Sequence, residues 1–304
     1  MAKVWKYLRR HWMLYAMLIP GLAYIIIFKY IPMYGLSIAF KDYEGIGDIA
    51  NAQWVGWENF TKLFSKAAFI RSFKNTVIIS FAKILFGFPA PIILALFIDS
   101  LRKKGLKKLV QTSVILPNFI SWVVIYGLMY AILGPSSGVI SEILTFFGFE
   151  GKIPDLLSSK EYFREVIVGS YIWKSAGIGT IVYLAALTGI DPQLYEAAAI
   201  DGAGPWRKTW HISLAGLRTT IIVMLIFRVG EMMHAGFDHI YAISNNAVIS
   251  VADIIDTYIY RVGLEQGNFS LATAAGFIQS IIGLVMVLIT NYVAKKVDPD
   301  SGIM

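Results

Sequence analysis

The sequence predicts an all-α integral membrane protein whose chain crosses the bilayer six times. Three observations support this prediction: an apolar composition, six apolar runs of suitable length and an uneven distribution of basic residues. Hydrophobic residues make up 57% of the 304 residues and charged residues only 15%, whereas a soluble domain carries about 25% charged residues. The mean hydropathy is +0.62. The length alone would also fit two soluble domains, so the apolar runs decide the class.

Six segments rich in Ile, Leu, Val, Phe and Ala are long enough to span the membrane. A transmembrane helix needs about 20 mostly apolar residues. We expect helices because the bilayer core offers no partner for unpaired backbone groups, and because barrel strands would be shorter and would alternate in polarity. The predicted spans, all within a single domain of residues 1–304, are 12–28, 77–98, 114–133, 166–187, 217–233 and 271–293.

Basic residues outside the spans set the orientation of the chain. The segments before the first span and after spans 2, 4 and 6 carry 14 Lys and Arg residues against six acidic residues. The opposite side carries 10 basic and 14 acidic residues. We therefore expect both termini in the cytoplasm. The net charge of +7 follows from this topology and requires no nucleic acid as a partner.

Two segments near the membrane surface have simple interpretations. The apolar run 12–28 resembles a signal peptide, but no small-residue cleavage site follows it, so we expect it to remain as the first span. Within residues 54–75, Phe60, Leu63 and Phe64 fall at helical spacing. This spacing predicts an amphipathic helix at the outer interface.

The sequence lacks the patterns of several common chemical sites. It contains no cysteine, which excludes disulfides, iron–sulfur clusters and thiolate zinc sites. Glu231, His234 and Asp238 could share a helix face and hold a metal. They have no evident supporting residues, so we interpret them as interfacial polar residues. Residues 204–209 lack the glycine that a phosphate-binding loop needs before its Lys-Thr pair, so we expect no nucleotide on this chain.

The polar stretch 191–215, between spans 4 and 5, predicts a hairpin of two short helices on the cytoplasmic side. Asp191 can cap the first helix, which glycines end, and Pro205 can open the second. Small residues on the hairpin let another backbone approach closely, and acidic residues offer charges to a basic partner. An ordinary helical loop is the alternative on composition alone. The residues of interest are Glu196, Ala197, Ala198, Asp201, Gly202, Ala203 and Gly204.

This hairpin resembles the signature loop of ABC-importer permeases. The family pattern is Glu-Ala-Ala, three residues, Gly, nine residues and Ile-x-Leu, and it matches through Glu196, Gly202 and Leu214. Ile200 and Asp201 extend the match to the carbohydrate-uptake branch. The family usually has proline where this chain has Ala215. Further stretches that resemble permeases for polysaccharide fragments are LIPGLAYIIIFKYIPMYGLSIAFKDY, VGWENFTKLF, LPNFISWVVI and WKSAGIGTIVYLAAL.

The resemblance implies the six-helix core of a type I ABC importer permease in the bacterial cytoplasmic membrane. It implies that the chain is not an enzyme and binds no cofactor. A pair of separate ABC ATPases would bind ATP and Mg and would contact the hairpin. It also implies a second homologous permease and an extracytoplasmic solute-binding protein. The substrate would be an oligosaccharide, a fragment of a complex and in some cases acidic polysaccharide.

Three basic residues lie well inside the predicted spans, away from their ends, where each costs roughly 2.5–3.5 kcal/mol at a helix centre. We expect Lys83 to snorkel outward. Arg228 precedes Glu231 by three residues on one helix face, and both a structural ion pair and a substrate contact remain open. Lys174 is the strongest candidate for the substrate path, because aromatic residues accompany it and a cation suits acidic sugars. The candidates for the path are Trp173, Lys174, Tyr183, Arg228 and Glu231.

Two other classes of membrane protein are weighed against a permease. A membrane-embedded enzyme that modifies glycans or lipids would need clustered acids or a histidine pair, and the sequence shows neither. A proton- or sodium-coupled carrier often contains inverted repeats and unwound spans, and the sequence shows no sign of them.

Overall fold

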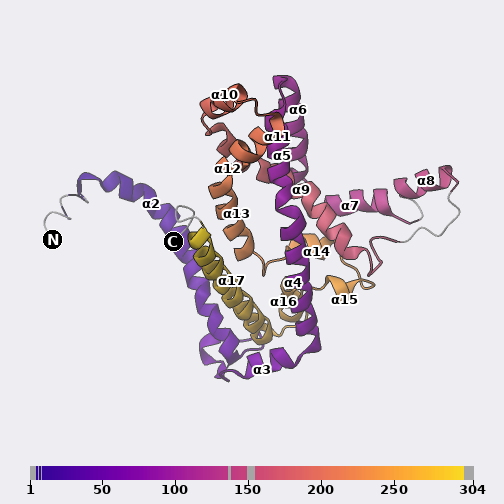
Figure 1. Ribbon diagram of the computed structural model, residues 1–304. Helices are drawn as coiled ribbons and strands as arrows, with labels where there is room; N and C mark the ends of the chain where they lie inside the picture. Colours follow the sequence, from indigo (N-terminus) through magenta and orange to yellow (C-terminus); the bar gives the residue numbers. More distant parts are fainter. Residues whose placement is uncertain (1–4, 6, 8, 136–137, 149–154, 298–304) are drawn as a thin grey trace. The chain divides into compact units, whose positions relative to one another are not determined.

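The computed structural model describes residues 5, 7, 9–135, 138–148 and 155–297 (Figure 1). Lys3, Lys6, Asp298 and Asp300, which belong to the predicted cytoplasmic charge, lie outside these residues, as do the ends of the predicted domain 1–304. The chain divides into two compact units, one formed by residues 1–65 and 259–277 and the other by residues 66–258 and 278–304.

The first unit contains an apolar helix and a small aromatic cluster. A two-stranded antiparallel sheet pairs Lys41 with Trp54, and the ring of Phe40 stacks on that of Trp54 at 5.5 Å. A short helix, α3, forms where the amphipathic helix is predicted, and Phe60 and Leu63 are buried in it. The elements are α2 (Trp12–Ile25), η1 (Ile26–Tyr30), η2 (Ile31–Phe40), β1 (Lys41–Asp42), η3 (Ile49–Asn51), β2 (Gln53–Trp54), α3 (Glu58–Ser65), η6 (Arg261–Glu265) and the start of α17 (Phe269–Val297).

The second unit is organised around α9, which packs against α4, α5 and α6 (Figure 1). Gly177 allows the close crossing of α9 and α6, because a Cβ atom there would overlap the carbonyl group of Val114. The elements are α4 (Ala67–Gly87), α5 (Pro89–Ser100), α6 (Lys104–Ile115), η4 (Leu116–Phe119), α7 (Trp122–Leu133), α8 (Val139–Phe146), α9 (Phe163–Thr188), α10 (Pro192–Ile200), α11 (Pro205–Lys208), η5 (Thr209–Ser213), α12 (Leu214–Gly216), α13 (Arg218–Gly230), α14 (Phe237–Ile243), α15 (Ile249–Ala252), α16 (Ile255–Tyr260) and the rest of α17.

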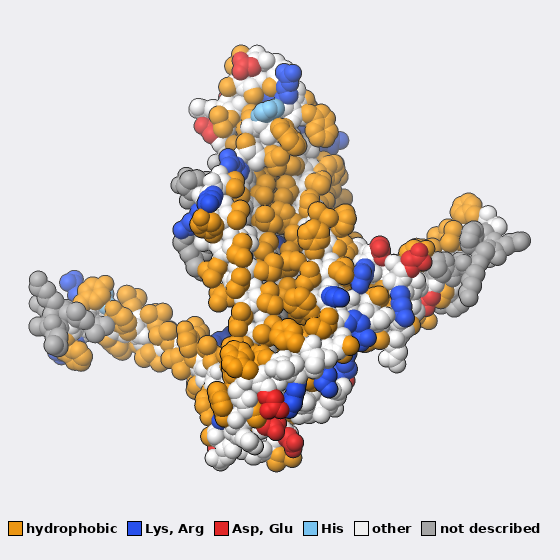
Figure 2. Space-filling model, turned by 60° about the horizontal axis from the view of Figure 1, so that its bottom comes forward, with side chains coloured by type: hydrophobic (Ala, Val, Ile, Leu, Met, Phe, Trp, Pro, Cys, Tyr) orange, Lys and Arg blue, Asp and Glu red, His pale blue; other side chains and the backbone are white. Residues whose placement is uncertain are grey.

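The surface of the protein is that of a membrane protein. Figure 2 shows one face covered largely by hydrophobic side chains. Along α4 and α5, Phe81, Phe86 and Phe97 are each more than half exposed. Soluble monomers rarely leave such large contiguous apolar areas in water, so these side chains are suited to contact with lipid.

Three helices in the described part of the chain are long and apolar enough to cross a membrane, and two bent pairs raise the number to five. The three are Trp12–Phe40, Ala67–Ser100 and Phe269–Val297. The predicted fourth span corresponds to α9, a single helix of 26 residues whose apolar character Lys174 interrupts. The count of six spans therefore stays a prediction.

The predicted third span is not a straight helix, and a second bend lies where the predicted fifth span begins. Lys104–Phe119 and Trp122–Leu133 meet at an angle of 106°, and Pro205–Gly216 and Arg218–Gly230 meet at 58°. At the sharper bend, Pro117 has no N–H group for a helical hydrogen bond. Ser121 then caps α7 by accepting a hydrogen bond from the N–H of Val124 at 3.4 Å.

Candidate functional site

A cavity of about 350 Å³ lies in the second unit. Residues from α4, α9 and α13 line it, together with the bend before α7 and the loop that follows α13. Lys83, Lys174 and Arg228 all contribute to its wall, against the single carboxylate of Glu231 among the described residues. The cations that the sequence places within the spans therefore meet in one cavity.

Lys83 is buried rather than extended to the membrane surface, so the expectation that it snorkels is wrong. Its side chain is 8% exposed. Its Nζ atom donates hydrogen bonds to the carbonyl oxygen of Ala235 at 2.6 Å and to Nδ1 of His239 at 3.0 Å. It also lies 4.9 Å from the ring centroid of Tyr171. The loop after α13 and helix α14 thus supply the acceptors that hold this ammonium group inside the cavity.

The partners of His239 define its tautomer. An ammonium group has only donors, so Nδ1 of His239 accepts from Lys83 and Nε2 carries the proton. Nε2 donates to Oγ of Ser170 at 3.0 Å, and that hydroxyl donates to the carbonyl oxygen of Ile167 at 3.1 Å. The imidazole ring stacks on Trp122 with 3.7 Å between centroids. His239 is therefore a fixed, neutral part of the cavity wall.

Lys174 holds the bend between η4 and α7. Its Nζ atom donates to the carbonyl oxygens of Asn118, at 2.9 Å, and Ile120, and it lies 5.2 Å from the ring centroid of Trp122. Carbonyl groups at a helix end lack partners within the helix. Lys174 therefore satisfies the broken backbone from the neighbouring helix while it also lines the cavity.

Replacing Lys174 with Met is expected to lower the melting temperature of the complex in detergent by several degrees. Two carbonyl groups would lose their donor, at about 1–3 kcal/mol for each unsatisfied group. A thermal scan would measure the loss. Lys174→Arg is the matched control, because it keeps the charge and the donors. An equal loss in both variants would contradict the assigned role of the ammonium group.

The other predicted path residues divide between the cavity and its surroundings. Arg228 and Glu231 line the cavity and form an ion pair at 3.7 Å, one of the two alternatives for Arg228. Glu231 is 70% exposed, so the pair is weak and Arg228 stays available for a ligand. Trp173 lines a separate apolar pocket. Tyr183 is buried in a cluster with Ala95, Ile98 and Leu217.

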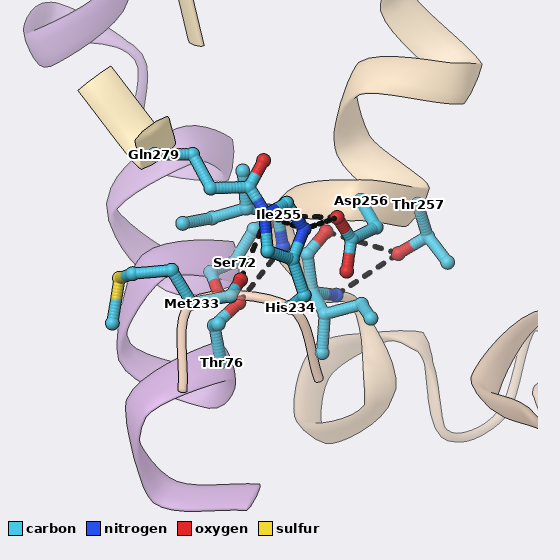
Figure 3. A network of polar contacts seen from close by, with 9 residues as sticks. Ser72, Thr76, Met233, His234, Ile255, Asp256, Thr257 and Gln279 are labelled. Carbon is cyan, nitrogen blue, oxygen red and sulfur yellow. Dashed lines mark hydrogen bonds and ion pairs between the residues drawn. The ribbon is translucent and has the colours of Figure 1, made fainter. Parts of the chain in front are cut away.

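Of the three residues weighed as a metal site, His234 contacts another side chain, and the described residues contain no group of three or more His, Cys, Asp or Glu side chains that could hold a metal ion. Nδ1 of His234 lies 3.3 Å from Oδ1 of Asp256, and this hydrogen bond raises the pKa of His234. Nε2 of Gln279 donates to the same carboxylate oxygen and to the carbonyl oxygen of Met233, both at 2.7 Å (Figure 3). His234 therefore donates to Asp256, and the loop after α13 is fixed to α16 and α17.

Polar side chains of α4 hold the segment before α16, as Figure 3 shows in part. Oγ of Ser72 donates to Oδ2 of the buried Asp253 at 2.7 Å. Nδ2 of Asn75 donates to the carbonyl oxygen of Asp253 at 3.0 Å, and the N–H of Ile255 donates to Oγ1 of Thr76 at 2.8 Å. The Asn-Thr pair at 75–76 thus positions a segment about 180 residues further along the chain.

In the stretch of the predicted hairpin, the chain forms the short helices α10 and α11, which residues 201–204 connect. Asp191 caps α10 by accepting a hydrogen bond from the N–H of Gln193 at 2.9 Å. At the end of α10, Gly202 has φ +75°, and the N–H of Ala203 donates to the carbonyl oxygen of Ala198 at 2.8 Å. This is a Schellman motif, which glycine favours because it adopts positive φ without strain.

The hairpin presents its signature residues to the surroundings. Glu196, Ala197, Asp201, Gly202 and Gly204 are exposed, and Ala198 and Ala203 are half-buried. Three large apolar side chains of the hairpin are also exposed: Ile200 at 88%, Trp206 at 86% and Trp210 at 67%. Sequence reasoning named Ile200 only as part of the family pattern and did not select the two tryptophans. The signal in the sequence that could have identified them is the occurrence of large apolar residues in a predominantly polar loop. Such a surface is suited to docking another protein.

The fold and this site define a membrane permease of the ABC type. Residues 87–299 match the family described as "Binding-protein-dependent transport system inner membrane component", and the chain belongs to this family. It is therefore a transporter subunit rather than an enzyme, which overturns the alternative of a membrane-embedded enzyme.

Two relatives come from Bacillus subtilis (strain 168). The chain is 42% identical over 283 residues to the polygalacturonan/rhamnogalacturonan transport system permease protein YteP, covering 93% of this chain and 88% of that protein. It is also 42% identical over 294 residues to the protein LplB, covering 97% and 92%.

Solved structures show the same fold. A bacterial ABC transporter involved in the import of the acidic polysaccharide alginate has a chain with a TM-score of 0.90 and 41% identity, over 97% of this chain and 99% of that one. A bacterial alginate ABC transporter in complex with an alginate pentasaccharide-bound periplasmic protein gives a TM-score of 0.89 and 41% identity, over 97% and 98%. The resemblance identified from the sequence is confirmed.

Proposed function

We propose that this chain is the permease subunit of an ATP-driven importer of acidic oligosaccharides, and that the cavity is its part of the translocation path. The observation that carries the proposal is the cavity wall, where Lys83, Lys174 and Arg228 face a single acid. Sugar acids need cations, and their rings present CH faces that the aromatic side chains of Trp122 and Tyr171 can cover. Transport of polygalacturonan, rhamnogalacturonan and alginate by its relatives supports an acidic substrate.

The proposed subunit crosses the membrane six times as a single domain, with α9 as the fourth span. Both termini and the hairpin 191–215 lie in the cytoplasm, which the excess of basic residues on that side supports. A second homologous permease completes the path. A solute-binding protein delivers the oligosaccharide from outside, in line with the periplasmic protein bound to the alginate transporter.

The hairpin would couple this subunit to the ATPase pair that binds ATP and Mg. Glu196 and Asp201 would contact basic groups of the ATPase, and Ala197, Ala198, Gly202, Ala203 and Gly204 would allow close packing. Ile200 and Trp206 would bury their apolar surface in the same interface. The hydroxyl groups of Tyr195 and Ser213 lie 3.0 Å apart and brace the hairpin, so that movement of the ATPase reaches α13 through helices.

The assembly is tested by purifying the tagged chain in a mild detergent and identifying its partners by mass spectrometry. We expect a second six-span protein and an ABC ATPase, with ATP hydrolysis lost in Glu196 variants. A stable chain that purifies alone would contradict the proposed complex.

The substrate class is tested by uptake into proteoliposomes that contain the complete complex and its binding protein. We expect Arg228→Met to lower uptake of oligogalacturonates by about tenfold or more, the value of one charge-assisted hydrogen bond. Arg71→Met is the matched control, because Arg71 is exposed on α4 and does not line the cavity. Absence of uronate uptake by the unmodified complex would overturn the acidic substrate.

A further inference from the structure

The wall of the cavity on α4 contains two polar groups with unused capacity for hydrogen bonds. The hydroxyl of Ser80 is buried, with the residue 4% exposed, and it has no hydrogen-bond partner among the described residues. Lys83 follows one helical turn later on the same face. Its ammonium group has three N–H donors, of which Ala235 and His239 take two. Both residues line the cavity.

The hydrogen-bond partners of Lys83 do not balance its charge. Both of its hydrogen-bond acceptors are neutral groups, a backbone carbonyl and an imidazole nitrogen. The charged groups that share the cavity are Lys174 from α9, Arg228 from α13 and Glu231, and Glu231 pairs with Arg228. A buried cation is unfavourable unless it is paired, so the region around Ser80 and Lys83 favours an anion.

We propose that Ser80 and Lys83 form a subsite for a carboxylate group of the transported sugar. One carboxylate oxygen would accept from the hydroxyl of Ser80 and the other from the free N–H of Lys83. This arrangement gives the Ser80 hydroxyl and the third N–H of Lys83 an acceptor and gives the ammonium group a counter-charge. Hydrogen bonds in which the donor or the acceptor is ionised are stronger than those between neutral groups. The proposal rests on the proposed function, because it assumes that acidic oligosaccharides enter the cavity.

A neutral ester distinguishes this subsite from general affinity for sugars. The methyl ester of a uronate keeps the sugar rings but has no negative charge. A carboxylate subsite therefore predicts that the complex prefers the free acid to the ester, and that Ser80 and Lys83 are responsible for that preference. Contacts of rings with Trp122 or Tyr171 would favour acid and ester alike.

The test uses a thiol reporter in the assembled complex. The chain has no cysteine, so Ser175→Cys, at a partly exposed position in the cavity wall, gives the only thiol in this subunit. The rate of its reaction with N-ethylmaleimide is measured against the concentration of trigalacturonate or of its methyl ester. We expect the acid to protect the thiol at concentrations about tenfold or more below those of the ester.

A second substitution in the Ser175→Cys complex then shows which residue is responsible for the preference for the free acid over the ester. Lys83→Met is expected to remove it, and Ser80→Ala to reduce the affinity for the acid a few-fold while affinity for the ester stays the same. The Ser80→Ala variant is expected to fold normally, because the substitution removes a hydroxyl that has no hydrogen-bond partner in the described chain. Lys74→Met is the control, because Lys74 is exposed on α4 outside the cavity.

Two results would overturn the subsite, and they have different meanings. If the acid protects the thiol equally well with and without Lys83 and Ser80, the subsite is wrong and the acidic substrate stands. If neither sugar protects the thiol in the Ser175→Cys complex and the unmodified complex takes up no uronate, both the subsite and the proposed substrate class are wrong.

Discussion

Replacing Gly202 with Asp is expected to uncouple ATP hydrolysis from transport while the complex stays assembled in the membrane. Gly202 has φ +75° at the end of α10, and a side chain in this left-handed conformation costs about 1–2 kcal/mol. A Cβ atom at this position would meet nothing within 4 Å in the chain itself, so the new carboxylate points at the proposed ATPase surface. We expect at least tenfold less uptake for each ATP hydrolysed.

The comparison variant is Gly202→Asn, which has nearly the same size, carries no charge and tolerates positive φ better than most residues. We expect this variant to retain much of the coupling. ATPase activity and uptake would be measured on the same proteoliposomes. Normal transport by Gly202→Asp would count against the hairpin as the coupling element.

Replacing Gly177 with Val is expected to prevent stable folding of the subunit. Helices α6 and α9 cross there with their backbones in contact, and a Cβ atom would lie on the carbonyl group of Val114 and 2.8 Å from the backbone nitrogen of Ile115. Backbone atoms cannot rotate away as a side chain can. We therefore expect a loss above the ~1–3 kcal/mol that is usual for overpacking a core, visible as a sharp fall in the amount of folded subunit in the membrane.

Gly169→Val is the matched control for this prediction. Gly169 lies on the same helix, and a Cβ atom there would meet nothing within 4 Å in this chain. Both substitutions insert the same β-branched residue into α9, so any difference between them comes from the crossing with α6. Equal yields of folded protein from the two variants would contradict the role assigned to Gly177.

Features that depend on neighbouring residues could be predicted from the sequence. The apolar runs predicted helices in the right places, because length and composition are local properties. The hairpin was predicted in detail, since Asp191, Gly202 and Pro205 determine its caps and its turn through their own backbone preferences. The sequence analysis selected Lys174, Arg228 and Glu231 as path candidates, but it did not predict that they line one cavity together.

Features that depend on distant residues could not be predicted. The bend before α7 lies inside an apolar run of the length of one span, and Lys174, which satisfies its carbonyl groups, is more than 50 residues away. Lys83 was expected to snorkel because its acceptors, at Ala235 and His239, lie more than 150 residues further on. Trp173 lines a separate apolar pocket and Tyr183 lies in a buried cluster. Apolar residues occur on every side of α9, so its composition does not show which side faces the cavity.

The polar face of α4 also determines the order in which the subunit can be completed during synthesis. Lys83 leaves the ribosome 152 residues before the carbonyl group that accepts its hydrogen bond. The hydrogen-bond partner of Ser72 and Asn75, Asp253, is synthesised later still. At roughly 5–20 residues per second, this delay is on the order of ten seconds or more. During that time the nascent helix keeps an ammonium group and several unpaired polar groups at the membrane. A subunit whose translation stops before residue 235 therefore has a permanently unsatisfied helix, a feature that membrane quality control can recognise.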